Sequence, residues 1–262
     1  MDPQVAIVVN GRTISRDEYL AALQGEYDAF AAHTGFQASD IAEVTSYLND
    51  KVRDQLINRI LVQQAALSLG IAITQEQLNA EIASLRGTDE QEFQAWLQDN
   101  QLTESQLTAQ YADQMLALAV RDAVTKDTAR EQPHRHVRYL VTSSLEQAQL
   151  AREALNAGSD FAEVTRQYSS DISLHASGGD VGFIPRGILP EAADQAAFTL
   201  AEDAISDVVL TASGFYIVQV LEIDISRPVS EDYWPFVLQN AFQSWLANER
   251  SQAEIAINPV VE

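Results

Sequence analysis

The hydrophobic period of this chain changes twice, and these changes constrain its fold more than any other feature. Before Pro133, apolar side chains recur every three or four residues over long stretches, as in amphipathic helices. Between Pro133 and Glu222 they fall into shorter runs, some of them strand-like, around a glycine-rich loop. After Pro228 the helical period returns. The chain is therefore predicted to be an α+β protein, with one α/β domain inserted into a mostly helical lobe.

The region before Pro133 is predicted to open with a hairpin and to continue as helices. Asn10-Gly11 separates two short apolar runs, and this pair accepts the positive φ angles of a tight turn. Ser15, Thr74 and Thr103 are each followed three residues later by Glu or Gln, which is the pattern of a capping box at a helix start. Five helices are expected. The first begins near Arg16, the second covers about 41–69, and the third begins after Thr74. The fourth covers 90–98, and the fifth begins after Thr103 and ends near Thr125.

After Pro133 the sequence predicts strands at 136–142 and 214–222, with helices over 143–158, 161–168 and 191–198 between them. A last helix is expected to open at Pro228 and Ser230. Its apolar stripe, which includes Trp234 and Phe242, is too wide for a solvated helix and must pack against another element. We expect that element to be the first lobe. The predicted domains are therefore residues 1–132 together with 228–262, and residues 133–227.

Composition and motifs exclude several classes of function. The formal net charge is -22, so clustered cations that could hold nucleic acid are not expected. The absence of cysteine excludes disulfides, thiol nucleophiles and cysteine-ligated zinc. Asp171 and Asp180 lack the spacing of a calcium loop, and Gly178-Gly179 lacks the Lys of a phosphate-binding loop, so no metal or cofactor is expected. No segment is long enough to span a bilayer.

The order of motifs from His134 to Ile223 resembles a parvulin-type peptidyl-prolyl isomerase domain of the PpiC kind. The segment carries, in order, VRYLV, AREALNAGSDF, YSSD, GGDVGF, AAFTL and GFYIVQVLEI. The flanking segments VAIVVNGRTISRDEYL, INRILVQQAALSLG and FQSWLANERSQAEI resemble the chaperone lobe of SurA-like and PrsA-like folding factors. The resemblance therefore covers nearly the whole chain.

The resemblance also implies which residues would form the proline-binding cleft. In parvulins this cleft combines two histidines, a Cys or Asp, a Met or Leu, and phenylalanines. The matching positions are Arg138 for the first histidine, Asp171 for the Cys or Asp, Leu189 for the Met or Leu, Ala193 for the pocket phenylalanine, Phe198 for the second phenylalanine, and Tyr216 for the last histidine. Asp171 is thus the candidate catalytic group, and the other five are candidate substrate contacts.

The replaced positions bear directly on activity. Prolyl isomerisation has a barrier of about 18–20 kcal/mol from amide conjugation, which a catalyst lowers by gripping proline and placing polar groups. Imidazoles exchange protons near neutral pH, whereas Arg138 stays charged and Tyr216 stays neutral there. We expect Arg138 to form a fixed ion pair if it lies beside Asp171. Weak or absent isomerase activity follows.

The leading hypothesis is an extracytoplasmic, ATP-independent folding chaperone that holds unfolded or extended polypeptides, including Xaa-Pro segments. Its signal or anchor would lie outside this sequence. One alternative is a working peptidyl-prolyl isomerase whose cleft tolerates the substitutions. Another is a docking or dimerisation module, with a second copy of the chain as partner.

Overall fold

The computed structural model describes residues 2–34, 41–100 and 102–258. The chain divides into two compact units, Met1–Lys126 with Phe242–Glu262, and Asp127–Ala241. The second boundary of these units falls inside a helix, between Ala241 and Phe242, whereas the predicted domains part at 227 and 228. The α+β class predicted from the sequence is confirmed, because a helical region and a sheet-containing region both occur.

The first unit is mainly helical and carries a small three-stranded sheet of order β2-β1-β7. Its elements are β1 (Val5–Val9), β2 (Arg12–Ser15), α1 (Arg16–Thr34), α2 (Ile41–Leu69), α3 (Gln75–Arg86), α4 (Glu90–Asp99), α5 (Glu104–Thr125) and β7 (Ile255–Ile257). Strand β7 pairs antiparallel with β1 and was not predicted from the sequence. A last helix, α9 (Trp234–Gln252), contributes its second half to this unit.

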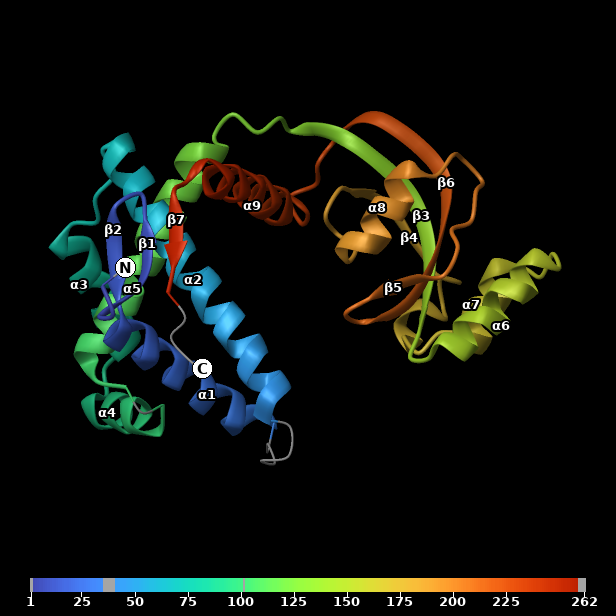
Figure 1. Ribbon diagram of the computed structural model, residues 1–262. Helices are drawn as coiled ribbons and strands as arrows, with labels where there is room; N and C mark the ends of the chain where they lie inside the picture. Colours follow the sequence, from blue (N-terminus) through green and yellow to red (C-terminus); the bar gives the residue numbers. More distant parts are fainter. Residues whose placement is uncertain (1, 35–40, 101, 259–262) are drawn as a thin grey trace. The chain divides into compact units, whose positions relative to one another are not determined.

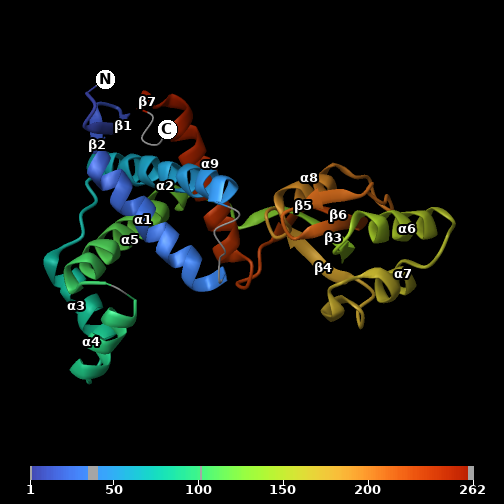
Figure 2. The ribbon, with the colours of Figure 1, turned by 60° about the horizontal axis from the view of Figure 1, so that its bottom comes forward.

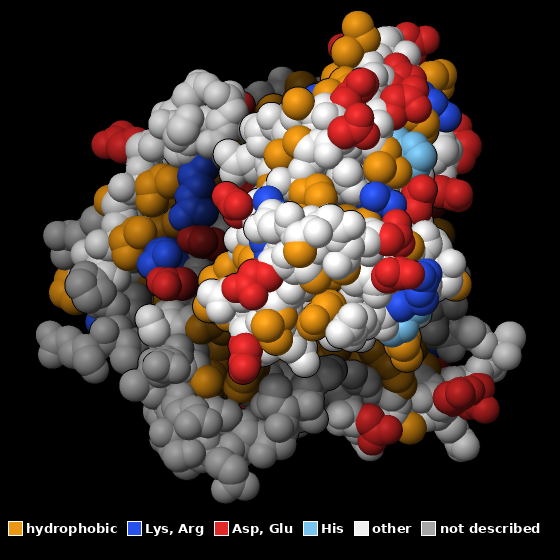
Figure 3. Space-filling view, turned by 90° about the vertical axis from the view of Figure 1, so that its right-hand side faces the viewer, with side chains coloured by type: hydrophobic (Ala, Val, Ile, Leu, Met, Phe, Trp, Pro, Cys, Tyr) orange, Lys and Arg blue, Asp and Glu red, His pale blue; other side chains and the backbone are white. Residues whose placement is uncertain are grey.

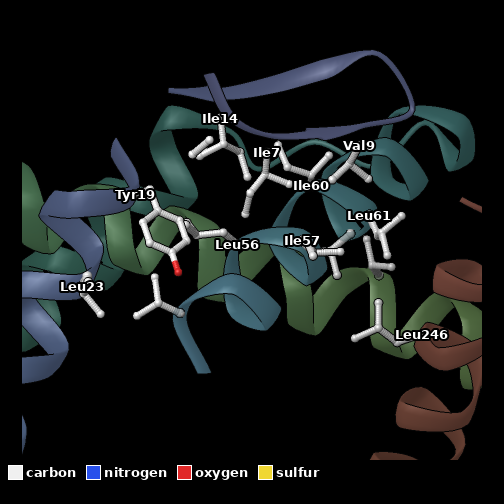
Figure 4. Packing of buried hydrophobic residues seen from close by; sticks show 14 of the residues in the cluster. Ile7, Val9, Ile14, Tyr19, Leu23, Leu56, Ile57, Ile60, Leu61 and Leu246 are labelled. Atoms are coloured by element: carbon white, nitrogen blue, oxygen red, sulfur yellow. The ribbon is translucent and has the colours of Figure 1, made fainter. Parts of the chain in front are cut away.

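The core of the first unit lies between the hairpin and α2. Figure 4 shows Ile7, Val9 and Ile14 of the hairpin directed toward Leu56, Ile57 and Ile60 of α2, with Leu246 of α9 nearby. Phe242 of α9 belongs to the same buried cluster, so the second half of α9 packs where the sequence predicted. Burying such aliphatic side chains supplies about 1.5–3 kcal/mol each, which offsets the cost of ordering long helices.

The helix starts in the first unit follow the predicted caps. The Thr74 and Thr103 hydroxyls each accept a hydrogen bond from the backbone N–H three residues later. In return, the side-chain oxygens of Gln77 and Gln106 accept from the backbone N–H groups of Thr74 and Thr103. Ser15 accepts from the Glu18 N–H at 3.1 Å, but the Glu18 side chain pairs with Arg59 instead of the cap.

The second unit is a four-stranded antiparallel sheet of order β4-β3-β6-β5, covered on both faces by helices (Figure 1). Its elements are β3 (Glu131–Thr142), α6 (Leu145–Asn156), α7 (Phe161–Tyr168), a 3₁₀ turn η2 (Ile172–Leu174), β4 (Asp180–Pro185), α8 (Glu191–Thr199), β5 (Val209–Thr211) and β6 (Gly214–Pro228). Strand β4 lies within the segment that was expected to be a glycine-rich loop.

Pro133 does not mark a boundary, because it lies inside the central strand β3. The β3–β6 ladder shifts register between Gln132 and His134, and Pro133 is the residue at that irregularity. A proline has no N–H for a ladder, so a position where the pairing skips is where a central strand tolerates one.

The two faces of the second sheet have separate cores. Helix α8 covers one face and buries Ala193, Ala197 and Phe198 against Val137, Val141 and Val218. Helices α6 and α7 cover the other face and bury Ala151, Leu155 and Phe161 against Leu140 and Ile217. Figure 3 shows acidic side chains in several separate groups between apolar ones on one side of the molecule, as the net charge of -22 leads one to expect.

Candidate functional site in the sheet-containing unit

Four of the six residues that the sequence assigned to a proline-binding cleft lie in one cluster. Leu189, Ala193, Phe198 and Tyr216 all belong to the buried core between α8 and the sheet. Leu189 comes from the loop before α8, Ala193 and Phe198 from α8, and Tyr216 from β6. Their solvent-exposed fractions are 8%, 0%, 8% and 8% respectively, so the side chains assigned to this cleft are almost completely buried.

Arg138 does not join these residues. Its Nε donates to the Gln219 Oε1 at 2.8 Å, and its guanidinium lies over the Phe161 ring at 4.7 Å from the centroid, on the α6–α7 face of the sheet. The ion pair with Asp171 was expected only if Arg138 lay beside it, and among the described residues these two side chains form no ion pair. The β3 side chains that reach the α8 face are Val137, Tyr139 and Val141.

Tyr139 therefore occupies the position in the cleft that the family resemblance had assigned to Arg138. Its ring stacks on that of Tyr216, with centroids 5.4 Å apart and planes inclined by 27°. Burial raises the pKa of the Tyr139 hydroxyl above its ordinary value of 10.0, and the neighbouring Tyr216, Asp171 and Tyr233 raise that pKa further. The Tyr139 hydroxyl thus keeps its proton throughout the neutral range, and it cannot exchange it as an imidazole would.

Asp171 acts as a cap in the YSSD turn. Its Oδ1 accepts from the Ser173 N–H at 2.9 Å and from the Ser173 hydroxyl at 2.6 Å, at the start of η2. Ser169 and Ser170 tie the turn to the Val141 carbonyl of β3, through the Ser169 hydroxyl at 3.3 Å and the Ser170 N–H at 2.8 Å. The carboxylate is half-buried and close enough to Tyr139 to raise the pKa of that hydroxyl.

The Gly178-Gly179 pair makes a tight turn against the sheet. A Cβ on Gly179 would lie 2.4 Å from the Tyr139 carbonyl oxygen, and one on Gly178 would lie 2.3 Å from the Ala162 Cβ. Both glycines have positive φ angles, 65° and 87° in chain order. The motif therefore serves close packing between β3 and α7.

His136 and Asp180 form a local pair outside the cleft cluster. The His136 Nε2 lies 2.8 Å from the Asp180 Oδ1, which also accepts the Gly182 N–H at 2.8 Å. His136 also packs beside Phe183, with ring centroids 5.0 Å apart. Asp180 and Asp171 thus have separate structural partners, so they do not act as a carboxylate pair.

Two arginines that the sequence did not single out cover the remaining phenylalanine of the cleft. The guanidinium of Arg135 lies over the Phe198 ring at 4.9 Å from the centroid, and that of Arg186 lies over it at 4.5 Å. Burial lowers the pKa of Arg135, and the nearby Arg186 lowers that pKa further. Asp194 accepts the Gly187 N–H at 2.7 Å and lies 3.4 Å from Arg186. A proline ring could reach the Phe198 face only by displacing these side chains.

Tyr233, in the segment between β6 and α9, also packs against the cleft cluster. It raises the pKa of the Tyr139 hydroxyl, which places the two phenols near each other. Alternation of side chains along β3 could have placed Tyr139 on the α8 face, together with Val137 and Val141. No local sequence pattern indicated that Tyr233 packs against this cluster. Chemically, the cluster offers phenol hydroxyls and apolar contacts, and the Asp171 carboxylate is engaged in a turn.

The described part of the chain contains no group of three or more His, Cys, Asp or Glu side chains arranged to hold a metal ion. Within the same residues, no helix is both long and apolar enough to cross a membrane.

Comparison with known proteins gives two family matches. Residues 1–121 match the SurA-like N-terminal domain, and residues 141–222 match the PPIC-type PPIASE domain. Foldase protein PrsA of Caldanaerobacter subterraneus subsp. tengcongensis is 24% identical over 267 residues, covering 96% of this chain and 82% of that protein. Periplasmic chaperone PpiD of Haemophilus ducreyi is 33% identical over 87 residues, covering 33% of this chain and 14% of that protein.

Among solved structures, the peptidylprolyl isomerase PrsA from Bacillus anthracis superimposes with a TM-score of 0.52 at 18% identity, covering 78% of this chain and 98% of that chain. At this identity the likeness bears on the fold alone, and it agrees with the α+β arrangement seen here. The two domain matches show that the chain carries a SurA-like N-terminal domain over residues 1–121 and a parvulin-type domain of the PPIC kind over residues 141–222.

Proposed function

We propose that this protein is an extracytoplasmic folding chaperone that holds unfolded or extended polypeptides without ATP and has weak or no prolyl isomerase activity. Residues 1–132 with 228–262 would form the chaperone lobe, and residues 133–227 the parvulin-like domain. The proposal draws on the names of the relatives, a foldase and a periplasmic chaperone, for the general role and compartment. The state of the cleft supports the low activity.

The stacked pair of Tyr139 and Tyr216 is the observation that carries the low-activity proposal. Their two phenol rings, with centroids 5.4 Å apart, occupy the part of the cleft where members of this family have titratable imidazoles. The Tyr139 pKa is raised above 10.0, so near neutral pH this hydroxyl does not share its proton with its neighbours as the imidazoles of the family can.

Three further features of the cleft support the same conclusion. Ala193 replaces an aromatic wall and is fully buried, so it offers a proline ring no exposed contact. Phe198 is covered by Arg135 and Arg186. Asp171 is held in a turn by Ser173.

Two assays on the full chain test the proposal. The first measures aggregation of a chemically denatured client protein on dilution, where the chaperone proposal expects dose-dependent suppression without nucleotide. The second measures cis/trans exchange of Xaa-Pro peptides with the wild type and with Asp171→Ala. Suppression without accelerated exchange supports the proposal. Accelerated exchange that Asp171→Ala abolishes would favour the working isomerase instead, and failure to suppress aggregation would remove the chaperone role.

A further inference from the structure

The helical unit contains an open hollow that no part of the parvulin-like resemblance explains. It has a volume of about 560 Å³ and lies where α3 ends and α4 begins, beside α5. Its apolar wall consists of Leu85, Phe93, Trp96 and Tyr111, and its rim carries Asp89 and Glu92. We call this feature the α3–α5 groove. Figure 2 shows α3 and α4 lying together at one end of α5.

The wall of the groove presents large apolar side chains to solvent on a firm base. Phe93 is 5% exposed and packs with Ile82, Leu97 and Leu107 in a small core that joins the three helices. Trp96 and Leu85, by contrast, are 46% and 42% exposed. The groove is therefore built on a packed cluster, and covering its exposed wall would remove apolar surface from water at about 25 cal/mol per Å².

The rim of the groove is acidic. Arg86, which also lines the groove, pairs with Glu90 and Glu104 and lies over the Phe93 ring at 5.2 Å. Its charge is thereby shared with two carboxylates. Asp89 caps α4 through backbone N–H groups, and neither Asp89 nor Glu92 meets a cation within ion-pair distance in the part of the chain that the structure describes. The unbalanced charge at the rim is negative.

From this combination of an aromatic wall and an acidic rim, we infer that the α3–α5 groove binds an extended polypeptide segment in which an aromatic or aliphatic side chain is flanked by Lys or Arg. The inference rests on the proposed chaperone function and names the class of segment that this function would select. The apolar side chain would enter between Trp96 and Tyr111, and the basic residue would meet Glu92.

Charge argues for a foreign segment over a second copy of the chain. The whole chain has 38 acidic and 16 basic side chains, so its own surface is a poor complement to an acidic rim. Like charges brought together at an interface weaken association, whereas a basic segment gains from the same rim. A second copy remains an outcome that the oligomeric state of the free protein distinguishes.

The test measures binding of two fluorescein-labelled peptides to the full chain by anisotropy. Both peptides contain Phe and Leu at the same positions, flanked by Lys in one and by Glu in the other. We expect the Lys peptide to bind tighter, and added salt to weaken it, because exposed charges are screened over about 10 Å at 0.1 M. Trp96→Ala should weaken it about tenfold, as loss of an aromatic anchor does. Glu92→Gln should reduce the preference for Lys over Glu.

Tyr47→Ala is the matched control, since Tyr47 is an aromatic residue of the same unit, is 61% exposed, and lies outside the groove. It should leave binding unchanged. Equal binding of the Lys peptide by Trp96→Ala and the wild type overturns the groove inference. If the wild type nevertheless suppresses client aggregation, the proposed function stands. A wild type that binds neither peptide also overturns the inference. Loss of a dimer in Trp96→Ala by sedimentation would assign the groove to a second copy instead.

Discussion

The cleft of the parvulin-like domain and the α3–α5 groove of the helical unit differ in what fills them. In the cleft, Ala193, Phe198 and Tyr216 are almost fully buried by the protein's own side chains. In the groove, Trp96 and Leu85 are nearly half exposed around a hollow of about 560 Å³. The region with the family's catalytic motif is closed, and the region without any motif is open.

This contrast separates a scaffold from its chemistry. The residues that shape the cleft, such as Gly179 and the YSSD turn, are kept together by contacts that the fold itself requires. The proposed loss of isomerisation rests on the groups around the cleft, where Tyr139 stacks on Tyr216, and Arg135 and Arg186 cover Phe198. A motif can therefore serve packing independently of the reaction that its family performs.

The largest effect we expect comes from Gly179→Ala, which attacks the scaffold of the cleft. The new Cβ would lie 2.4 Å from the Tyr139 carbonyl oxygen at a φ of +87°, so the backbone must move. We expect the free energy of unfolding of the second unit to fall by about 3–5 kcal/mol. Gly158→Ala is the control, because its φ is +89° but nothing lies within 4 Å, so it should cost about 1–2 kcal/mol. Urea denaturation followed by circular dichroism measures both, and equal losses would contradict the packing role.

A smaller effect is expected from Ala193→Phe, which restores the phenylalanine that the family resemblance places in the cleft. Ala193 is fully buried, so a phenyl ring must displace its neighbours at a cost of about 1–3 kcal/mol. Ala157→Phe, at an exposed helix end, should change stability by less than about 0.5 kcal/mol. Thermal denaturation gives the comparison. A stable Ala193→Phe variant would mean that the cleft has room, and the contrast with the groove would fail.

Local signals predicted much of this fold from the sequence. The capping boxes at Thr74 and Thr103 marked helix starts correctly, because a cap depends on residues three positions apart. The apolar stripe of α9 predicted its packing on the first unit through Phe242. Leu189, Ala193, Phe198 and Tyr216 were also predicted together.

Nonlocal pairing set the limit of prediction. Tyr139 was missed in favour of Arg138, although the alternation of Val137, Tyr139 and Val141 along β3 places these side chains on the α8 face. Pro133 was taken as a boundary because the register shift that admits it into β3 depends on β6. Strand β7 is three residues long and pairs with β1 from the other end of the chain, so no local pattern could indicate it.

The smallest effect is expected from Asp194→Asn, which probes the loop beside the cleft. Burial raises the pKa of Asp194 above 3.8, although the Gly187 N–H and Arg186 lower it in part. The native state then binds this proton more tightly than the unfolded state, so the wild type loses stability relative to the variant as pH rises from about 3.8 through the raised pKa. Near neutral pH the variant should lie within about 0.5 kcal/mol of the wild type, since Asn can still accept the Gly187 bond. Asp207→Asn, at an exposed position, is the control, and a wild type that gains stability relative to Asp194→Asn as pH rises through this range would contradict the assignment.

Exchange spectroscopy on one peptide tests the central contrast most directly. The peptide carries the Lys-flanked aromatic segment followed by an Xaa-Pro bond, and nuclear magnetic resonance reports binding and cis/trans exchange in the same sample. The account predicts that the full chain binds the peptide through Trp96. Prolyl cis/trans exchange should keep its uncatalysed time constant of tens to hundreds of seconds. Accelerated exchange that survives Trp96→Ala and disappears in Asp171→Ala would show that the cleft works, and would contradict the account.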